Sequence, residues 1–467
     1  MTTATATAHP VRSRYLILSE NAYSRADGTV VRLGYLSRTA RFFSLDRENA
    51  DRLERGDVTA ITRATLRELE RLGAVVETGL DEPAGALSEL RTGSDSLAHR
   101  RFTIMPTAYC NMGCSYCGQE HYKSPASAAR MERLIARVEA VMADERTGTV
   151  SVTWFGGEPL LGYRVIREMS TRFVAQAQAT GTRYSARMAT NGSLISVPKL
   201  TELHDEFALR HAEITLDGPP PIHDRRRILK NGRGSFDHCV GVLAELDRSG
   251  AAPDLRINIR VNIDNENEVF VPDLLRRLAA DGLNAPRFTL QFMPVHSWGN
   301  DVSAVEIEAR AYAAREVPWL QLAAELGFKT TLLPTRPKAT TCIATTRSGE
   351  IHDPGGKVYS CSEHPLVPVV RDTGAVALAG ELAEAQPRPA GDFDDWYDQV
   401  AGTAQPCHGC PFLPVCGGSC PKLWREGHLP CPSFKFNAQQ RLDLVATTRW
   451  GLRRVAAEGG GGAAWRS

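Results

Sequence analysis

The chain has 467 residues, with 55 Lys and Arg against 54 Asp and Glu and a formal net charge of +1. This length gives room for roughly two to four domains and a sizeable core, so the chain needs no disulfide staples. The balanced charge excludes a global field that would attract nucleic acid or an anionic membrane. There is no signal-peptide pattern and no run of about 20 apolar residues that could span a membrane, so we expect a cytoplasmic location.

Residues 1–100 are expected to form a small α+β domain. Apolar strand-like segments are followed by two helical segments, and Pro83, Gly85 and the polar run at 91–100 predict a linker to the next domain. The strand-like segments are 14–19, 31–37 and 40–45, and the helical ones are 47–55 and 64–72.

Between residues 101 and 330 short apolar runs alternate with amphipathic helical stretches such as 129–143 and 272–282. This alternation predicts a parallel α/β barrel or open barrel, in which residues just after the strands line the active site. The predicted strands are 101–107, 150–157, 184–192, 211–218, 255–263 and 288–295.

Eleven cysteines in a reducing compartment indicate metal ligands or catalytic thiols rather than disulfides. Three lie at 110–117, one at 239, and seven between 342 and 431. The regular alternation fades in the last of these regions, so residues 331–440 are expected to form a small domain organised by metal. Residues 441–467 are expected to form a C-terminal helix and a Gly-rich disordered tail.

The first cysteines, Cys110, Cys114 and Cys117, have the spacing CxxxCxxC and follow the first barrel strand. Three thiolates are fewer than the four that a closed tetrahedral metal site needs. A [4Fe–4S] cluster held by three thiolates keeps one iron open for a small molecule. A zinc site completed by a distant His, or a loop with buried thiols, remains an alternative on the spacing alone.

This spacing, with Tyr116 before the third cysteine, resembles the signature of the radical S-adenosylmethionine (SAM) enzymes. The resemblance implies a [4Fe–4S] cluster whose open iron binds SAM. Reduction of the cluster then splits SAM into methionine and a 5'-deoxyadenosyl radical, which abstracts hydrogen from the substrate. One departure is Gly118, where an aromatic residue is common in the family.

The next strand ends carry further elements of the resemblance. WFGGEPLL matches the family's GGEP element, which implies that Gly156, Gly157 and Glu158 hold the SAM amino group. ATNGSLI offers hydrogen-bonding groups for a ribose; these are Thr190, Asn191 and Ser193. Each string on its own is more often a simple turn.

The stretch ITLDGPPPIHDRRR resembles a segment of the subgroup that modifies peptides and proteins. Its matching positions are Asp217, His223, Asp224 and Arg227. Asp217 and Arg227 are expected to contact SAM, although a structural hydrogen-bonded network is an equal alternative for this segment. Arg260, Asn262 and Gln291 are polar groups on apolar strands; Arg260 is expected at the cofactor, with satisfied core polar groups as the alternative.

The seven C-terminal cysteines do not divide into two closed zinc sites, although a zinc ribbon could explain a CxxC pair. Their spacing resembles the SPASM extension of radical SAM enzymes, which carries two auxiliary [4Fe–4S] clusters. The resemblance assigns the outer cluster to Cys407, Cys410, Cys416 and Cys431. It assigns the inner cluster to Cys342, Cys361 and Cys420, without a fourth cysteine. Cys239 is interpreted as a buried small apolar residue.

Together these resemblances imply an α/β enzyme with a partial (β/α)6 TIM-like barrel, a small α+β N-terminal domain and a cysteine-rich SPASM domain. We expect a peptide maturase, an oxidoreductase with three [4Fe–4S] clusters and SAM as cofactors. Its expected reaction is oxidative cross-linking of a ribosomally made precursor peptide, giving a thioether or a carbon–carbon or carbon–heteroatom ring. A flavodoxin or ferredoxin is the expected external electron donor.

The N-terminal domain resembles leader-binding modules of peptide maturases, which would add the peptide as a strand; a structural cap over the barrel is the alternative. A formylglycine-forming enzyme of the sulfatase-maturase type is disfavoured because the stretch around Cys342 has no carboxylate. A dehydrogenase of a small molecule remains open. A non-catalytic iron–sulfur module is disfavoured because it has no use for the GGEP and TNGS elements.

Overall fold

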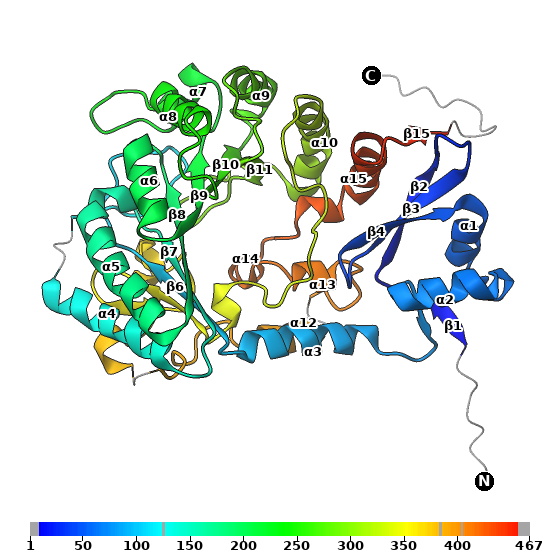
Figure 1. The fold of residues 1–467 in the computed structure, drawn as a ribbon, viewed down its shortest axis with the longest axis horizontal. Helices are drawn as coiled ribbons and strands as arrows, with labels where there is room; N and C mark the ends of the chain where they lie inside the picture. The colour runs from blue at the N-terminus through cyan, green and yellow to red at the C-terminus, as the bar shows by residue number, and fades with distance from the viewer. Residues whose placement is uncertain (1–8, 124–126, 383–384, 403–404, 456–467) are drawn as a thin grey trace, which may run out of the picture.

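The computed structural model describes residues 9–123, 127–382, 385–402 and 405–455. Figure 1 shows the barrel strands β6–β11 at one end of the molecule and the N-terminal unit at the other, with short helices of the C-terminal region between them. Among the described helices, none combines the length and apolarity needed to cross a membrane.

The N-terminal unit is built on an antiparallel sheet in the order β15-β2-β3-β4, with β2 Leu16–Ser24, β3 Val30–Leu36 and β4 Arg41–Asp46. A second small sheet pairs β1 Pro10–Arg12 with β5 Val75–Glu77. The helices are α1 Arg47–Arg55, the short 3-10 helix η1 Val58–Ala60 and α2 Arg63–Leu72. These elements confirm the strands and both helices predicted for this part of the chain.

The linker predicted around Pro83 and Gly85 is wrong, because α3 spans Glu82–Asp95. Asp81 caps this helix by accepting a hydrogen bond from Ala84 N at 3.0 Å, and proline is well tolerated in a helix's first turn. Leu87 and Leu90 are buried in a core that α3 shares with the N-terminal unit and with Trp396. Tertiary packing therefore overrides the local turn signals.

The six predicted barrel strands are all present and all parallel, in the order β11-β10-β9-β8-β7-β6. They are β6 His99–Ile104, β7 Thr149–Trp154, β8 Arg183–Thr190, β9 Leu209–Thr215, β10 Arg256–Ile263 and β11 Phe288–Pro294. Along β10, Ile257, Ile259 and Val261 are fully buried. The strands thus form the parallel sheet expected of a partial (β/α)6 barrel.

Helices connect these strands, as the sequence pattern predicts. They are α4 Ala128–Ala143, η2 Pro159–Gly162, α5 Tyr163–Thr180, α6 Val197–Asp205, α7 Pro220–Arg226, α8 Phe236–Arg248, η3 Glu268–Phe270, α9 Val271–Ala280 and α10 Ala309–Glu325. Cys239 lies in α8 and is fully buried, which confirms its interpretation as a core residue.

The C-terminal region joins the barrel through its own strands. β12 Gly349–His352 pairs in parallel with β6, and β13 Lys357–Tyr359 and β14 Ala375–Leu378 follow in antiparallel order. At this junction the buried carboxylate of Glu350 lies 3.0 Å from Arg100 and 2.6 Å from Arg137. The remaining elements are short: η4 Ile343–Thr345, α11 Pro368–Arg371, η5 Ala379–Glu381, α12 Trp396–Ala401, α13 Leu413–Cys416, α14 Pro421–Arg425 and η6 Ser433–Lys435.

The C-terminal helix begins earlier than expected, as α15 Ala438–Leu444, and continues as a π-helical turn, η7 Val445–Arg449. The chain then forms β15 Arg453–Arg454, which pairs with Tyr23 and Ser24 of β2 and had no signal in the sequence. The Gly-rich tail predicted to be disordered lies outside the described residues.

Candidate active site

The carboxyl ends of β6 to β11 lie along one edge of the parallel sheet, and the segments that follow them carry the candidate cofactor residues. The three-thiol loop follows β6, the GGEP element follows β7, and Asn191 follows β8. Asp217 follows β9. In parallel sheets this edge is where ligands bind.

The three-thiol loop is held by the segment that ends α7. Gly113 N donates to Ile228 O at 3.0 Å, Ser115 N to Arg226 O at 3.1 Å, and Lys230 N to Asn111 O at 2.8 Å. The loop conformation is therefore supported by backbone hydrogen bonds of the protein itself.

The three thiols influence one another. Burial raises the pKa of Cys117 to about 11, and the charges of Cys114 and Cys110 act in the same direction. Cys110 accepts hydrogen bonds from Met112 N at 3.4 Å and from Asn191 Nδ2 at 3.7 Å. Bound metal deprotonates thiols, and donors aimed at sulfur are typical of iron–sulfur clusters, so this loop fits a cluster held by three thiolates.

Among the described residues, no three His, Cys, Asp or Glu side chains are arranged to bind a single metal ion. In a cubane cluster each thiolate binds its own iron, so the sulfurs need only surround the cluster.

Gly156 and Gly157 lie against the backbone of the cysteine loop. A Cβ on Gly156, whose φ is +115°, would lie 2.8 Å from Thr107 O, and one on Gly157 would lie 2.4 Å from Tyr109 O. Glu158 N donates to Tyr109 O at 2.9 Å. Only glycine allows the GGEP turn to approach the loop this closely.

Glu158 is fully buried and accepts three hydrogen bonds. The donors are Thr190 Oγ1 at 2.7 Å, Asn191 N at 2.7 Å and Leu160 N at 3.0 Å. Burial raises the pKa of Glu158, and these donors oppose that shift. The carboxylate thus joins the ends of β7 and β8, and its predicted contact with the SAM amino group stays a prediction.

Asn191 connects the β8 end to the cysteine loop. Its Nδ2 donates to Asn111 Oδ1 at 2.8 Å as well as to Cys110, and its Oδ1 accepts from Ser193 Oγ at 2.7 Å. Asn111 Nδ2 in turn donates to Ser193 Oγ at 2.9 Å. Thr190, Asn191 and Ser193 are brought together as predicted; a ribose contact stays a prediction.

Asp217 lies at the centre of a buried network. It accepts from Tyr116 Oη at 2.5 Å and from Asn262 N at 2.8 Å, and Arg227 lies 3.7 Å away. Arg227 also donates to Tyr116 Oη, and Asn262 Nδ2 does so at 3.0 Å. Arg227 Nε has no partner among the described residues. This network fixes the residue between the second and third cluster cysteines.

His223 and Asp224 have structural partners. Asp217 N donates to His223 Nδ1 at 3.2 Å, and Asp224 accepts from Ser235 N and Phe236 N at the start of α8. Burial lowers the pKa of His223 to about 3, with Arg227 and Arg226 acting in the same direction, so the imidazole is neutral. His223 and Asp224 therefore belong to a structural hydrogen-bonded network, which was the alternative for this segment.

Arg260 and Asn262 alternate with the buried apolar residues of β10. Arg260 Nε donates to Asn262 Oδ1 at 2.8 Å, and its guanidinium lies 3.4 Å from Glu213. Gln291 on β11 is exposed and accepts from Asn258 at 2.8 Å. The three predicted polar groups thus lie on neighbouring strands, and the contact of Arg260 with SAM stays a prediction.

The departure at Gly118 has a packing reason. A Cβ at this position would lie 2.5 Å from Trp298 O and 2.7 Å from Asn300 Oδ1. The segment after β11 therefore fills the space that an aromatic side chain would need.

The outer cysteine set, Cys407, Cys410, Cys416 and Cys431, lines one small cavity with Lys435. Lys435 Nζ lies 3.3 Å from Cys431 Sγ. Burial raises the pKa of Cys416 to about 12, and the charges of the other three thiols add to the effect. Four thiols around one cavity fit the outer cluster that the spacing implies.

The inner cysteine set also comes together. Cys342 and Cys361 pack in one cluster with Phe393. Burial raises the pKa of Cys361 well above its ordinary value, and the charges of Glu363, Cys342 and Cys420 act in the same direction. The inner set of three thiols therefore has a carboxylate beside it.

Glu363 and Lys435 are residues that sequence reasoning missed. Glu363 accepts only a 3.5 Å hydrogen bond from Ser362 and makes no ion pair with the described residues. Burial raises its pKa, while the charges of Arg260 and Lys422 lower it. The signal for Glu363 is its place two residues after Cys361, outside the stretch around Cys342.

Residues 104–278 match the sequence model of the Radical SAM superfamily. An uncharacterized protein of Synechocystis is 32% identical over 143 residues, which cover 28% of this chain and 34% of that protein. A serine-type anaerobic sulfatase-maturating enzyme of Bacteroides thetaiotaomicron is 28% identical over 141 residues, 28% of this chain and 32% of that enzyme. The chain thus matches about a third of the length of these curated relatives.

The solved structure of native anSMEcpe with bound AdoMet and the Kp18Cys peptide superposes with a TM-score of 0.57 at 16% identity, covering 74% of this chain and 97% of that one. The likeness supports the fold. The superfamily match, with the cysteine loop at the end of β6, identifies residues 104–278 as a radical SAM domain.

Proposed function

We propose that the protein is a peptide-modifying radical SAM/SPASM enzyme that forms an oxidative cross-link in a ribosomally made precursor peptide. The observation that carries the proposal is the grouping of ten cysteines into three sets, one on the barrel loop and two in the C-terminal region. An enzyme that only cleaves SAM and abstracts hydrogen would need only the first set of cysteines.

In this proposal Cys110, Cys114 and Cys117 hold the first cluster, and Gly156, Gly157 and Glu158 lie beside the SAM amino group. Thr190, Asn191, Ser193, Asp217, Arg227 and Arg260 complete the proposed SAM site. When bound, the reduced cluster supplies the electron that cleaves SAM to a 5'-deoxyadenosyl radical. The chain's own residues position the loop: Asn191 contacts Cys110, and Asp217 and Arg227 fix Tyr116.

The C-terminal cysteines are proposed to hold the two auxiliary clusters. Cys407, Cys410, Cys416 and Cys431 form the outer site, and Cys342, Cys361 and Cys420 the inner one. A substrate that has lost hydrogen must lose one more electron to form a new bond, and clusters in a buried setting are suited to accept it. Three sets of thiols in one chain therefore support a net two-electron oxidation.

A peptide substrate is supported by the fold, because a structure of similar fold contains a bound peptide. In the N-terminal unit, β15 covers the β2 edge of the sheet, whereas β4 is the other edge strand. We propose that a leader segment adds to β4, since exposed edges bind extended peptides by strand addition. A purely structural role of the unit remains the alternative.

A second candidate, a formylglycine-forming enzyme of the sulfatase-maturase type, is favoured by Glu363. The stretch around Cys342 has no carboxylate, but Glu363 lies next to the inner cysteine set and could serve as the base instead. Glu363→Gln separates a role on the substrate from a role in SAM cleavage. A substrate role predicts that product falls at least about tenfold while 5'-deoxyadenosine release persists.

The proposal is tested on anaerobically purified protein, which should carry about twelve irons. Co-expression with a short peptide encoded beside the gene should give a product lighter by two hydrogen masses per event, with a cross-link visible as missing fragment ions. A product that reacts with hydrazine carries an aldehyde and supports the second candidate. An unmodified peptide, with 5'-deoxyadenosine still released, contradicts the substrate assignment.

A further inference from the structure

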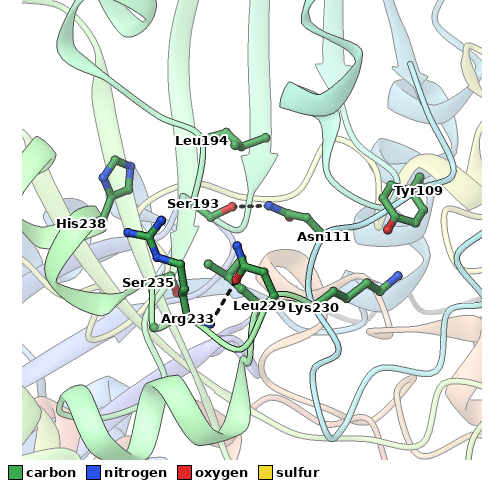
Figure 2. Close-up of a pocket in the computed structure, with 11 residues that line it drawn as sticks. Tyr109, Asn111, Ser193, Leu194, Leu229, Lys230, Arg233, Ser235 and His238 are labelled. Atoms are coloured by element: carbon green, nitrogen blue, oxygen red, sulfur yellow. Dashed lines mark hydrogen bonds between the residues drawn. The ribbon is translucent and has the colours of Figure 1, made fainter.

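A surface cavity of about 450 Å³ opens beside the three-thiol loop (Figure 2). We call it the Lys230 cavity. It is lined by Tyr109, Asn111, Ser193, Leu194, Leu229, Lys230, Asn231, Arg233, Gly234, Ser235 and His238. Residues 230–234 are exposed, whereas Glu158 and Asp217 on the proposed SAM side of the loop are buried. Ser193 of the proposed SAM site also lines the cavity. The cavity is therefore an external approach to the cysteine loop that borders this site.

The cavity and its rim are cationic. Lys230 Nζ lies 4.3 Å from the centre of the Tyr109 ring, and Lys123 Nζ lies 5.6 Å from the same ring. Arg233 adds a third exposed cation, and no lining residue is acidic. Within the described ranges, none of these three cations forms an ion pair with a carboxylate. Because the chain's net charge is only +1, this is a local positive surface.

One side chain, that of Asn191, connects the wall of the cavity to Cys110, the first cysteine of the loop. Two of the cavity's lining residues are joined by a hydrogen bond, which Asn111 Nδ2 donates to Ser193 Oγ at 2.9 Å (Figure 2). Asn111 Oδ1 then accepts from Asn191 Nδ2, which also donates to Cys110 Sγ at 3.7 Å. A partner seated in the cavity would lie close to the thiol that is proposed to bind the cluster.

We propose that the Lys230 cavity is the docking surface of an acidic, low-potential one-electron carrier protein. The inference rests on the proposed function, which requires one electron for each SAM cleaved. The reduced carrier loses that electron and the cluster gains it, so no bond or proton needs to be exchanged. Exposed cations without acidic partners suit a negatively charged protein surface, because opposite charge speeds encounter and fixes orientation.

Binding is the primary test. Oxidised flavodoxin, an acidic one-electron carrier, is titrated into the holoenzyme and into the variant Lys230→Glu/Arg233→Glu. We expect at least about tenfold weaker binding by the variant, and an affinity of the wild type that falls with added salt. Arg67→Glu, which reverses an exposed charge on α2, is the matched control and should bind as the wild type does. Unchanged binding by the double variant would overturn the proposal.

Carbodiimide cross-linking gives an independent map. Lys230 or Lys123 should form amide links to carboxylates of flavodoxin, detected by mass spectrometry. Links confined to lysines elsewhere on the chain would place the carrier on another surface and contradict the assignment.

Reductant choice separates docking from the SAM site. With flavodoxin and its reductase, the double variant should release 5'-deoxyadenosine at least about tenfold more slowly than the wild type; with dithionite the two should be equal. Equal loss with both reductants would assign the cavity to the SAM site and overturn the docking role. If the wild type releases none even with dithionite, the proposed function fails, while the binding and cross-linking results still decide the docking surface.

Discussion

The barrel loop and the C-terminal cysteine region present thiols on very different scaffolds. The barrel loop is followed by helices of 16 and 18 residues and is held by strands that pair over their full length. The helices that carry or flank the outer cysteines have four to six residues. We therefore expect the barrel core to form without metal, and the order of the C-terminal region to depend more strongly on bonds to metal.

The two regions also differ in how they treat charge. Around the barrel loop, Asp217, Arg227 and Tyr116 satisfy one another in a buried network. In the C-terminal region, Glu363 and Lys435 lie near cysteine sets and form no ion pair with a residue of opposite charge among the described residues. The first arrangement fixes geometry, and the second leaves charge available to act on a bound group.

The largest effect should come from Cys114→Ala. Loss of one barrel thiolate should abolish 5'-deoxyadenosine release and lower the iron content from about twelve to about eight per chain, because the auxiliary sets are separate. Release is measured by chromatography and iron by colorimetry. Cys239→Ala, which removes a buried thiol outside the three sets, should keep both values. Loss of all iron in Cys114→Ala would mean that the two regions are not independent.

Removal of iron by anaerobic chelation should act on one region and spare the other. We expect amide protection to be lost around the outer cysteines, in residues 405–435, and kept in β6 to β11, because these strands supply many residues of a large apolar core. Hydrogen exchange read by mass spectrometry measures this. Equal loss of protection in both regions would contradict the distinction drawn between the scaffolds.

Tyr116→Phe tests the buried network of the barrel. The hydroxyl contacts Asp217, Arg227 and Asn262, so its removal should lower the free energy of unfolding by about 2 kcal/mol. Tyr15→Phe is the matched control, since the buried Tyr15 hydroxyl has no partner among the described residues and its loss should cost almost nothing. Urea unfolding compares them, and equal losses would show that the network adds no stability.

His223 should make the barrel sensitive to acid. Its pKa is about 3 in the fold and 6.5 in the ordinary group, so its contribution is fully present above pH 6.5 and is lost as the pH falls toward 3. At pH 5 the loss should reach about 2 kcal/mol. Thermal unfolding of His223→Gln should show less dependence on pH than the wild type between pH 7 and 5. An identical dependence would mean that His223 is protonated at little cost.

The smallest effect should come from Lys435→Met. The ammonium 3.3 Å from Cys431 favours the more negative, reduced state of a cluster bound there, so its loss should lower the reduction potential of the outer cluster by about tens of millivolts. Redox titration followed by electron paramagnetic resonance measures the shift. Lys435→Arg should keep most of the potential, and equal shifts in both variants would point to packing rather than charge.

Much of the fold could be predicted from periodicity, because strands such as β10 alternate the buried residues Ile257, Ile259 and Val261 with polar ones, and helical patterns lie between the strands. The helix α3 could not, since Pro83 and Gly85 have the local chemistry of a turn. The strand β15 has two residues and pairs with Tyr23 and Ser24, far away in the sequence, so no local pattern reveals it.

The part of the candidate site that could be predicted is the part formed by residues with a recognisable spacing along the chain. The residues of the three cysteine sets, and those of the GGEP and TNGS elements, are brought together along the lines that the resemblance implies. The contact of Tyr116 with Asp217 links residues 101 positions apart and depends on neither spacing nor composition. Glu363 was missed because its relation to Cys342 and Cys420 arises only in three dimensions.

The pairing of β15 with β2 gives the cysteine-rich segment two anchored ends. Near its start, β12 pairs with β6 of the barrel. After its end, β15 pairs with β2 of the N-terminal unit. An apo form would therefore be a closed loop rather than a free arm, with less entropy to lose when metal arrives.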